Sequence, residues 1–200
     1  MVNEHVFRWL TMVKLGFVVE GKTEKLVIES GAFKAWLAAN GCEQVNPVLD
    51  ANGGGNLLPQ HIEPMVNLLK GAGAEHIIIL TDLELDPDFN TVKNRITTTH
   101  TDLIFIAVKA IEAWFLADSQ AINNWLETTD FHEASPEATV DMPWDRLKEI
   151  AEEREKRGPG TKVKFTKKIL KCGYDTQNAA EHGNAPSAEA FLNGLKALAE

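Results

Sequence analysis

The chain has 200 residues, enough for one domain with a full hydrophobic core, and its apolar, aromatic and charged fractions are those of an ordinary globular protein. The net charge of −9 excludes a general attraction to the phosphates of nucleic acid, so any such contact requires a local basic face. No apolar run reaches the roughly 18 residues of a membrane span, so we expect a protein that does not enter membranes. The two cysteines are far apart and no signal peptide is visible, which fits an acidic protein of the reducing cytosol.

The first half of the chain alternates apolar strands with amphipathic helices. Four apolar runs predict strands, over residues 14–20, 44–49, 76–80 and 103–108. Three segments with helical spacing predict helices, over residues 23–37, from the glycines of 52–56 to residue 69, and over 88–97. Pro47 favours an edge position for the second strand, and the strong hydrophobicity of 76–80 favours the centre of the sheet. This alternation is typical of a mostly parallel, doubly wound α/β sheet of four to five strands, with helices on both faces.

The second half of the chain is predicted to be helical. A helix starts within residues 109–118 and continues over 119–127, with Trp114, Phe115 and Leu116 as core residues. A turn-rich surface loop over 128–143 precedes helices over 145–157 and 188–198. We expect an α/β core of residues 1–120, in which residues 1–12 add an edge strand or a packed arm. A helical C-terminal extension of residues 121–200 is expected to pack on this core.

Acidic residues follow two of the predicted strands. Glu20 ends the first strand before a glycine, and Asp82, Glu84 and Asp86 follow the third. Because open parallel sheets bind ligands at the carboxyl ends of their strands, these acids indicate a site there, and Glu112 after the fourth strand is expected on the same edge. Carboxylates two apart on an extended segment point to the same side, and Mg²⁺ prefers oxygen ligands. Asp82 and Glu84 would share the ion, and Asp86 would be the next acid along the chain. Glu20 would be a further ligand or a general base. The alternative interpretation of residues 82–86 is a solvated acidic turn.

A glycine-rich stretch and a basic segment each allow two interpretations, one functional and one purely structural. The three glycines of residues 53–55 fit either a phosphate cradle or a flexible turn before a helix. Eight of the twenty basic residues gather within residues 154–171: Arg154, Lys156, Arg157, Lys162, Lys164, Lys167, Lys168 and Lys171. They form either a nucleic-acid face, with Lys164, Lys167 and Lys168 as its centre, or a solvated helix face that offsets Glu149, Glu152, Glu153 and Glu155. Lys22 and Lys109 are further candidates for contact with a substrate phosphate, and Lys22 also fits a solvated loop lysine.

The order of these motifs resembles the Toprim domain, which topoisomerases, primases and overcoming-lysogenisation-defect nucleases share. The resemblance covers about residues 13–118 and consists of a strand followed by Glu20-Gly21 and, one strand-helix-strand unit later, a strand followed by Asp82-x-acid. The stretches 19–24 (Val-Glu-Gly-Lys-Thr-Glu) and 111–118 (Ile-Glu-Ala-Trp-Phe-Leu-Ala-Asp) are similar to a bacterial Toprim-related family discussed in connection with phage defence. The resemblance implies a site of Glu20, Asp82 and Glu84, where Toprim domains have aspartate at the last position.

We therefore expect a Toprim-like fold that performs Mg²⁺-dependent phosphodiester cleavage or transfer on DNA or RNA, with Mn²⁺ as an alternative ion. Glu20, Asp82 and Glu84 would be catalytic, and Asp86 and Glu112 would support the ion. Three alternatives stay open. A phosphoacceptor domain would pair Asp82 with Lys109, although it normally has more acids after its first strand. A haloacid-dehalogenase phosphatase would have aspartate where this chain has Glu84. A non-catalytic Toprim-like module would bind an ATPase or nucleic-acid partner.

Overall fold

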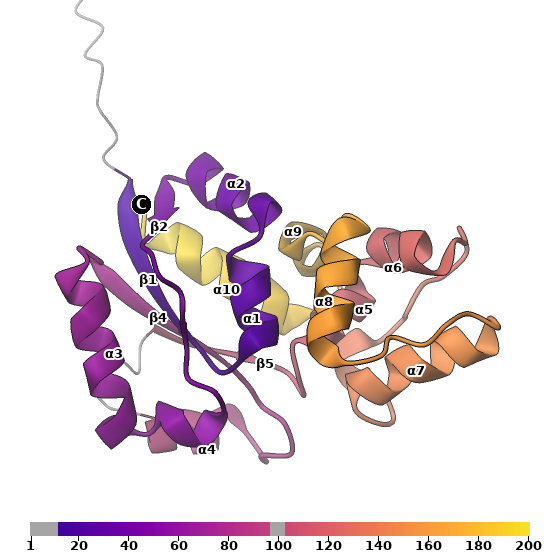
Figure 1. The fold of residues 1–200 in the computed structure, drawn as a ribbon, viewed down its shortest axis with the longest axis horizontal. Coiled ribbons are helices and arrows are strands. Elements are labelled where there is room, and N and C mark those ends of the chain that lie inside the picture. Colours follow the sequence, from indigo (N-terminus) through magenta and orange to yellow (C-terminus); the bar gives the residue numbers. More distant parts are fainter. Residues whose placement is uncertain (1–11, 97–102) are drawn as a thin grey trace, which may run out of the picture.

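The alternating first half of the chain folds into a parallel sheet with helices on both faces (Figure 1). The computed structural model describes residues 12–96 and 103–200. The N-terminal arm expected over residues 1–12 lies, apart from Met12, outside these residues.

Within the described residues the sheet has five strands: β1 (Val13–Val19), β2 (Cys42–Gln44), β3 (Leu49–Asp50), β4 (His76–Asp82) and β5 (Ile104–Ala107). Their order is β2-β1-β4-β5, with β3 also on β1, and every pairing is parallel. The predicted second strand is therefore split into two short strands that pair with the two ends of β1. The split falls at Pro47, which lies between them and has no N–H to donate to a ladder. As expected, β4 is central, between β1 and β5.

Four helices flank this sheet: α1 (Lys22–Ile28), α2 (Gly31–Ala39), α3 (Pro59–Gly71) and α4 (Phe89–Ile96). Successive side chains of β1 enter two separate hydrophobic clusters, because they point to opposite faces of the sheet. Phe17 packs in the cluster of α1 and α2, whereas Val18 packs in the cluster of α3 and α4. The helices that follow β1 therefore lie on one face of the sheet, whereas the helices before and after β4 lie on the other face. This makes the gap between the carboxyl ends of β1 and β4 the switch point of the sheet.

The helix predicted over residues 23–37 is broken into α1 and α2. Ser30 lies between them, and its hydroxyl accepts a hydrogen bond from the N–H of Phe33 at 3.2 Å. Serine in this position caps a new helix, so the chain turns here instead of continuing straight. The break keeps α1 short and places its first turn directly after the end of β1.

The rest of the described chain is helical: α5 (Glu112–Ala117), α6 (Ser119–Leu126), α7 (Pro143–Glu153), α8 (Lys162–Lys171), α9 (Thr176–Ala180) and α10 (Pro186–Ala197). The last helix returns to the sheet on the face of α1 and α2 (Figure 1). Phe191 of α10 stacks on Phe33 with ring centroids 5.8 Å apart and on Trp114 at 5.4 Å. The helix comes so close that a Cβ at Gly194 would lie 2.5 Å from ring atoms of Phe105.

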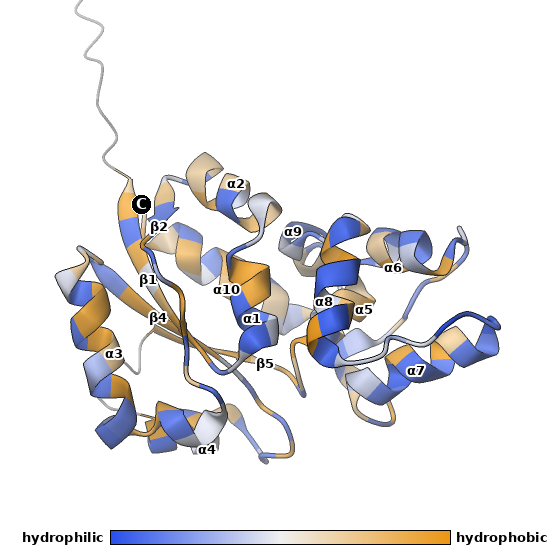
Figure 2. Cartoon of the chain, in the orientation of Figure 1, coloured by the Kyte–Doolittle hydropathy of each residue, from blue (hydrophilic) through white to orange (hydrophobic). Residues whose placement is uncertain are grey.

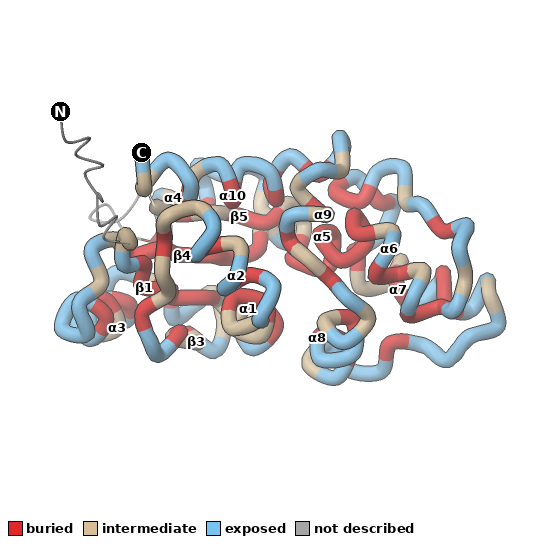
Figure 3. Tube along the Cα trace, turned by 90° about the horizontal axis from the view of Figure 1, so that it is seen from above, coloured by how far each residue is buried: buried red, intermediate tan, exposed pale blue. Residues whose placement is uncertain are grey.

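The core does not stop where the sheet stops. Figure 2 shows apolar residues along β1, β4 and β5, and Figure 3 shows that buried residues continue from these strands into α5 and α6. One hydrophobic cluster includes Leu15 of β1, Trp125 of α6 and Leu195 of α10, and the expected core residues Trp114, Phe115 and Leu116 are fully buried in it. None of the helices in the described ranges is long and apolar enough to cross a membrane.

Candidate acidic site at the sheet switch point

Glu20 and Asp82 lie side by side at the carboxyl ends of β1 and β4. Val19 is in register with Leu80, so the residues that follow each strand meet at the same edge. The Oε2 atom of Glu20 accepts hydrogen bonds from the hydroxyl of Thr81 and from the N–H of Asp82, the latter at 3.1 Å. The first strand-end carboxylate is therefore held against the backbone of the second strand.

The glycine-rich loop packs against this carboxylate. Gly53 has a φ of +115°, which favours glycine, and its N–H donates to the carbonyl of Glu20 at 2.8 Å. A Cβ at Gly54 would lie 3.3 Å from Oε1 of Glu20, tighter than most such contacts. The glycines thus allow the backbone to approach Glu20 closely, and the loop forms one wall of the acidic site.

Two more carboxylates, each in the first turn of a helix, complete the cluster. Glu24 of α1 is 5% exposed, and Glu112, the first residue of α5, is 1% exposed. Asp82, 7% exposed, links β4 to the start of α5, because its Oδ1 accepts the N–H of Ile111 at 2.9 Å. Free amides at helix N-termini favour negative charge, which is one reason that these acids are tolerated here.

The cluster carries more negative charge than its surroundings neutralise. Burial raises the pKa of Asp82 well above its usual range, and the charges of Glu24, Glu112 and Glu20 raise it further. Burial also raises the pKa of Glu24 to about 7, with contributions from Glu112 and Glu20. Desolvated acids that repel one another bind protons or cations more readily than exposed acids do.

Lys162 is a cation within this cluster. As the first residue of α8 it places its Nζ 3.0 Å from Oε1 and 3.2 Å from Oε2 of Glu112. Both oxygens of Glu112 therefore lie within ion-pairing distance of this ammonium, and the buried Oε1 meets no other donor among the described residues. Burial lowers the pKa of Lys162, but the charge and hydrogen bond of Glu112 outweigh it, and the net shift is upward.

Glu84 and Asp86 were predicted to join Asp82 at the ion, but neither is among the acids whose charges act on Asp82. The strand ends at Asp82, and Glu84 is exposed with a φ of +50° and donates its N–H to the carbonyl of Lys109 at 2.6 Å. Asp86 pairs with Arg95 at 2.6 Å. The expectation that residues 82 and 84 share one side of an extended segment was wrong, because a left-handed residue turns the chain directly after the strand.

The two single lysines predicted to meet a phosphate have different surroundings. Lys22 is exposed at the start of α1. Lys109 donates from Nζ to the carbonyl oxygens of Thr139 and Asp141, the second at 3.0 Å. Its ammonium therefore ties the loop after α6 to the end of β5, and Asp82, its partner in the phosphoacceptor alternative, is not among its hydrogen-bond partners.

The lysines of α8 form one exposed face. Lys164, Lys167, Lys168 and Lys171 recur at helical spacing, opposite the buried Phe165. Two of the four glutamates expected to offset them, Glu149 and Glu153, pair with Arg146 instead. Within the described ranges, these four lysines take part in no ion pair.

Donor chemistry and spacing give different answers about a metal ion. Buried carboxylates with excess negative charge, and an Oε1 of Glu112 without a hydrogen bond, are suitable donors for Mg²⁺. However, no group of three or more His, Cys, Asp or Glu side chains in the described part of the chain is arranged to hold an ion. The acids are instead engaged by Lys162 and by backbone and hydroxyl donors.

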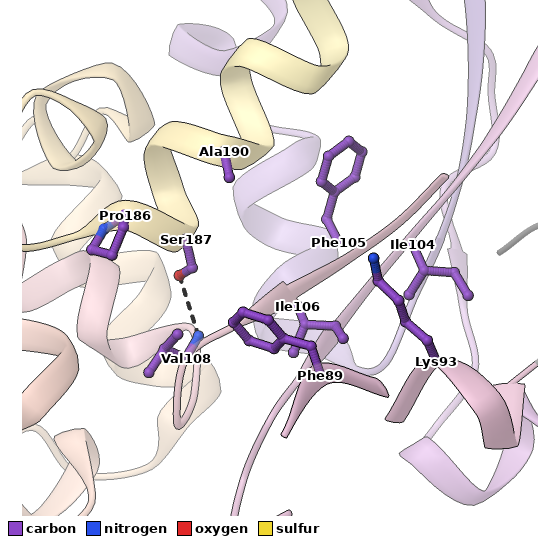
Figure 4. A pocket seen from close by; sticks show the side chains of 9 residues that line it. All are labelled: Phe89, Lys93, Ile104, Phe105, Ile106, Val108, Pro186, Ser187 and Ala190. Carbon is purple, nitrogen blue, oxygen red and sulfur yellow. Dashed lines mark hydrogen bonds between the residues drawn. The ribbon is translucent and has the colours of Figure 1, made fainter. Parts of the chain in front are cut away.

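A separate cavity of about 430 Å³ lies along β5, between α4 and α10 (Figure 4). Its walls are largely apolar and include none of the clustered acids, so it does not contribute to this site. The residues that line it are Phe89, Lys93, Ile104, Phe105, Ile106, Val108, Pro186, Ser187 and Ala190.

Two residues of the site were missed by sequence reasoning. Glu24 had a usable signal, since it lies one helical turn after Glu20 in a helix that starts at the strand end. Lys162 had none, because it is 50 residues from Glu112 and reaches the cluster only through the packing of α8 against α1. Comparisons with protein-family models, with curated proteins and with solved structures found no match for this chain.

Proposed function

We propose that this protein is a Toprim-like enzyme that cleaves or transfers phosphodiesters of nucleic acid with Mg²⁺. The observation that carries the proposal is the meeting of Glu20 and Asp82 at the switch point of a parallel sheet. Glu24 and Glu112 surround them, and together the four acids exceed the single charge that Lys162 offsets. A cytoplasmic role in phage defence, which the sequence motifs suggest, is part of the same proposal.

Glu20, Asp82 and Glu112 are the acids that would hold the ion. They would have to approach one another to do so, because no three acids of the described residues are already arranged around one point. Mg²⁺ supplies positive charge next to a phosphodiester, which stabilises the charge that develops in the transition state. Glu84 is not among the acids whose charges act on Asp82, so we do not assign it to the ion.

The chain's own groups would orient the reactants and move the proton. Two donors hold Oε2 of Glu20, which leaves its Oε1, beside Gly54, for a ligand. In hydrolysis, a water oxygen bonds to phosphorus and gives up a proton while the P–O bond to the leaving group breaks and that oxygen gains a proton. Glu24 is suited to accept or return such a proton, because its pKa is about 7.

The basic face of α8 is the proposed nucleic-acid contact. Lys162 at the start of this helix touches the acidic site, so Lys164, Lys167 and Lys168 continue from the site along one helix. Phosphates bound along these lysines would place an adjoining phosphodiester near the acids. The chemistry of phosphate contact is the same for DNA and RNA, and both are substrates to be compared.

The test is cleavage of labelled DNA and RNA with Mg²⁺ or Mn²⁺. We expect wild-type protein to cut at least one of them, and Glu20→Gln to cut at least 100-fold more slowly while binding it equally well, because a carboxylate is lost and no phosphate contact is lost. Glu63→Gln, which removes the same charge from the exposed side of α3, is the matched control and should cut like wild type. Equal rates for Glu20→Gln and wild type would exclude a catalytic role for the site.

One observation favours a second candidate, the non-catalytic module that binds a nucleic-acid or ATPase partner. Glu112 is paired with Lys162, and Asp82 accepts a backbone N–H, so both acids have structural partners. If wild-type protein binds nucleic acid in a salt-dependent way but never cuts it with either ion, this second candidate replaces the first.

A further inference from the structure

The acidic cluster has its own cation, supplied by a distant part of the chain. Glu112 is 1% exposed at the start of α5 and is fixed in place by the packing of that helix, whereas the side chain of Lys162 is 48% exposed. The two partners therefore differ in their access to solvent. The carboxylate cannot turn to water, but the ammonium can, because the long lysine stem lets its charged end move into solvent.

Lys162 is also the sole donor near this carboxylate in the described chain. Its Nζ lies 3.0 Å from Oε1 and 3.2 Å from Oε2 of Glu112, and the buried Oε1 meets no other donor there. One ammonium also faces four carboxylates, and its charge lowers the pKa values of both Asp82 and Glu24 without cancelling their upward shift. A doubly charged ion with several oxygen ligands would balance this cluster better than one lysine does.

We propose that Lys162 is an exchangeable counter-ion of the site, which leaves Glu112 when a divalent cation binds. The inference rests on the proposed function, since it takes Mg²⁺ as the ion of the site. The lysine and the ion would compete for the same carboxylate, Glu112. α8 packs beside α1 (Figure 3), so this exchange takes place where the basic helix meets the acidic site.

The competition predicts an order of affinities. Lys162→Met removes the competing charge and should tighten Mn²⁺ binding at least tenfold at pH 8. Lys162→Arg keeps a charge that pairs with a carboxylate through two N–H groups and is harder to displace, so it should weaken binding. Lys34→Met, which removes the same charge from the exposed side of α2, is the control and should change affinity less than twofold. Free Mn²⁺ is measured by its electron paramagnetic resonance signal, and thermal melts check folding.

A second measurement uses wild-type protein and does not depend on a variant that folds. In protein with ¹³C-labelled lysine, the Cε signal of Lys162, assigned by its loss in Lys162→Met or Lys162→Arg, should move on Mg²⁺ addition toward that of an exposed lysine such as Lys164. If Mn²⁺ binds wild type but affinity is the same in Lys162→Met and the Lys162 signal stays in place, the exchange is wrong and the proposed function stands. If neither wild type nor Lys162→Met binds Mn²⁺, both are wrong.

Discussion

Asp82 is at once an acid of the site and a structural acceptor. Its Oδ1 receives the N–H of Ile111 at 2.9 Å and so joins the end of β4 to the start of α5. Glu20 does the same toward Thr81 and the backbone of Asp82. Each carboxylate thus keeps one oxygen bound to the protein, which fixes the orientation of the other. Residues with this double use are poor choices for Ala substitution, because loss of activity would be confused with loss of structure.

Glu24 gives a test of buried charge that does not depend on catalysis. Its pKa is raised from 4.5 to about 7, so the folded state holds its proton more tightly than the unfolded state does. The ionised group therefore costs stability, fully above about pH 7 and not at all below about pH 4.5. Glu24→Gln should stabilise the protein at pH 8, by up to on the order of 3 kcal/mol, and much less at pH 5.

Urea unfolding at the two pH values, with EDTA present, measures this difference. Glu63→Gln on the exposed side of α3 is the control, and surface changes of this kind stay within about 0.5 kcal/mol. A Glu24→Gln variant whose gain in stability is the same at pH 5 and pH 8 would show that Glu24 is not charged at a cost in the folded protein.

At the scale of elements, α8 connects the two halves of the candidate function. Its inner side carries Phe165, which meets Phe115, Trp125 and Trp144 edge-on and so anchors the helix to α5, α6 and α7. Its outer side carries the lysine face, and its first residue reaches Glu112. In the proposed function, one amphipathic helix would bind phosphates along its length, while its first residue contributes a charge to the acidic site.

Replacing the centre of that face should weaken nucleic-acid binding without affecting the acids. For Lys164, Lys167 and Lys168 changed together to Ala, we expect weaker binding of all sequences alike. The slope of log affinity against log salt should fall by about 2 to 3, since each phosphate contact contributes about 0.9 on double-stranded DNA. Fluorescence anisotropy over a salt series measures both quantities.

The matched control is a triple change of Lys34, Lys70 and Lys196 to Ala, three exposed lysines on other helices. It alters net charge equally and should leave most of the slope unchanged. If both triple variants lose the same slope, binding depends on overall charge, and α8 is not a specific face.

At the scale of the whole molecule, the C-terminal helices complete the core. Phe191 of α10 stacks between rings from α2 and α5, and Ser187 at the start of α10 accepts the indole N–H of Trp114 at 2.8 Å. Glu137 from the loop after α6 accepts the N–H of Ser187 at 3.0 Å. These contacts tie the first and last parts of the chain together around one hydrophobic cluster.

A continuous core predicts one cooperative unfolding transition. Phe191→Ala should destabilise the protein by about 3–5 kcal/mol and still give a single transition, with far-ultraviolet circular dichroism and tryptophan fluorescence changing together. Asn193→Ala, an exposed change in the same helix, should have little effect. Two separate transitions would mean that the C-terminal helices fold independently of the sheet.

The amino-acid sequence by itself determined the alternation of strands and helices in the first half of the chain and the acids at the strand ends, but not the split of the second strand or of the first helix. These features depend on neighbouring residues: apolar runs predict β1, β4 and β5 to within two residues at each end, and Glu20 and Asp82 follow from where such runs stop. The glycine loop and the concentration of basic residues within 154–171 were also visible as local patterns, although no helix was predicted over residues 162–171.

Only the tertiary structure decided which charges meet. Lys162 joins Glu112 across 50 residues because α8 packs beside α1, and no local pattern encodes that contact. Glu84 and Asp86 were expected beside Asp82 because they are close in sequence, yet a left-handed turn and the Arg95 partner take them away. Ion pairs follow distance in space, and the packing of helices that are far apart in the chain sets that distance.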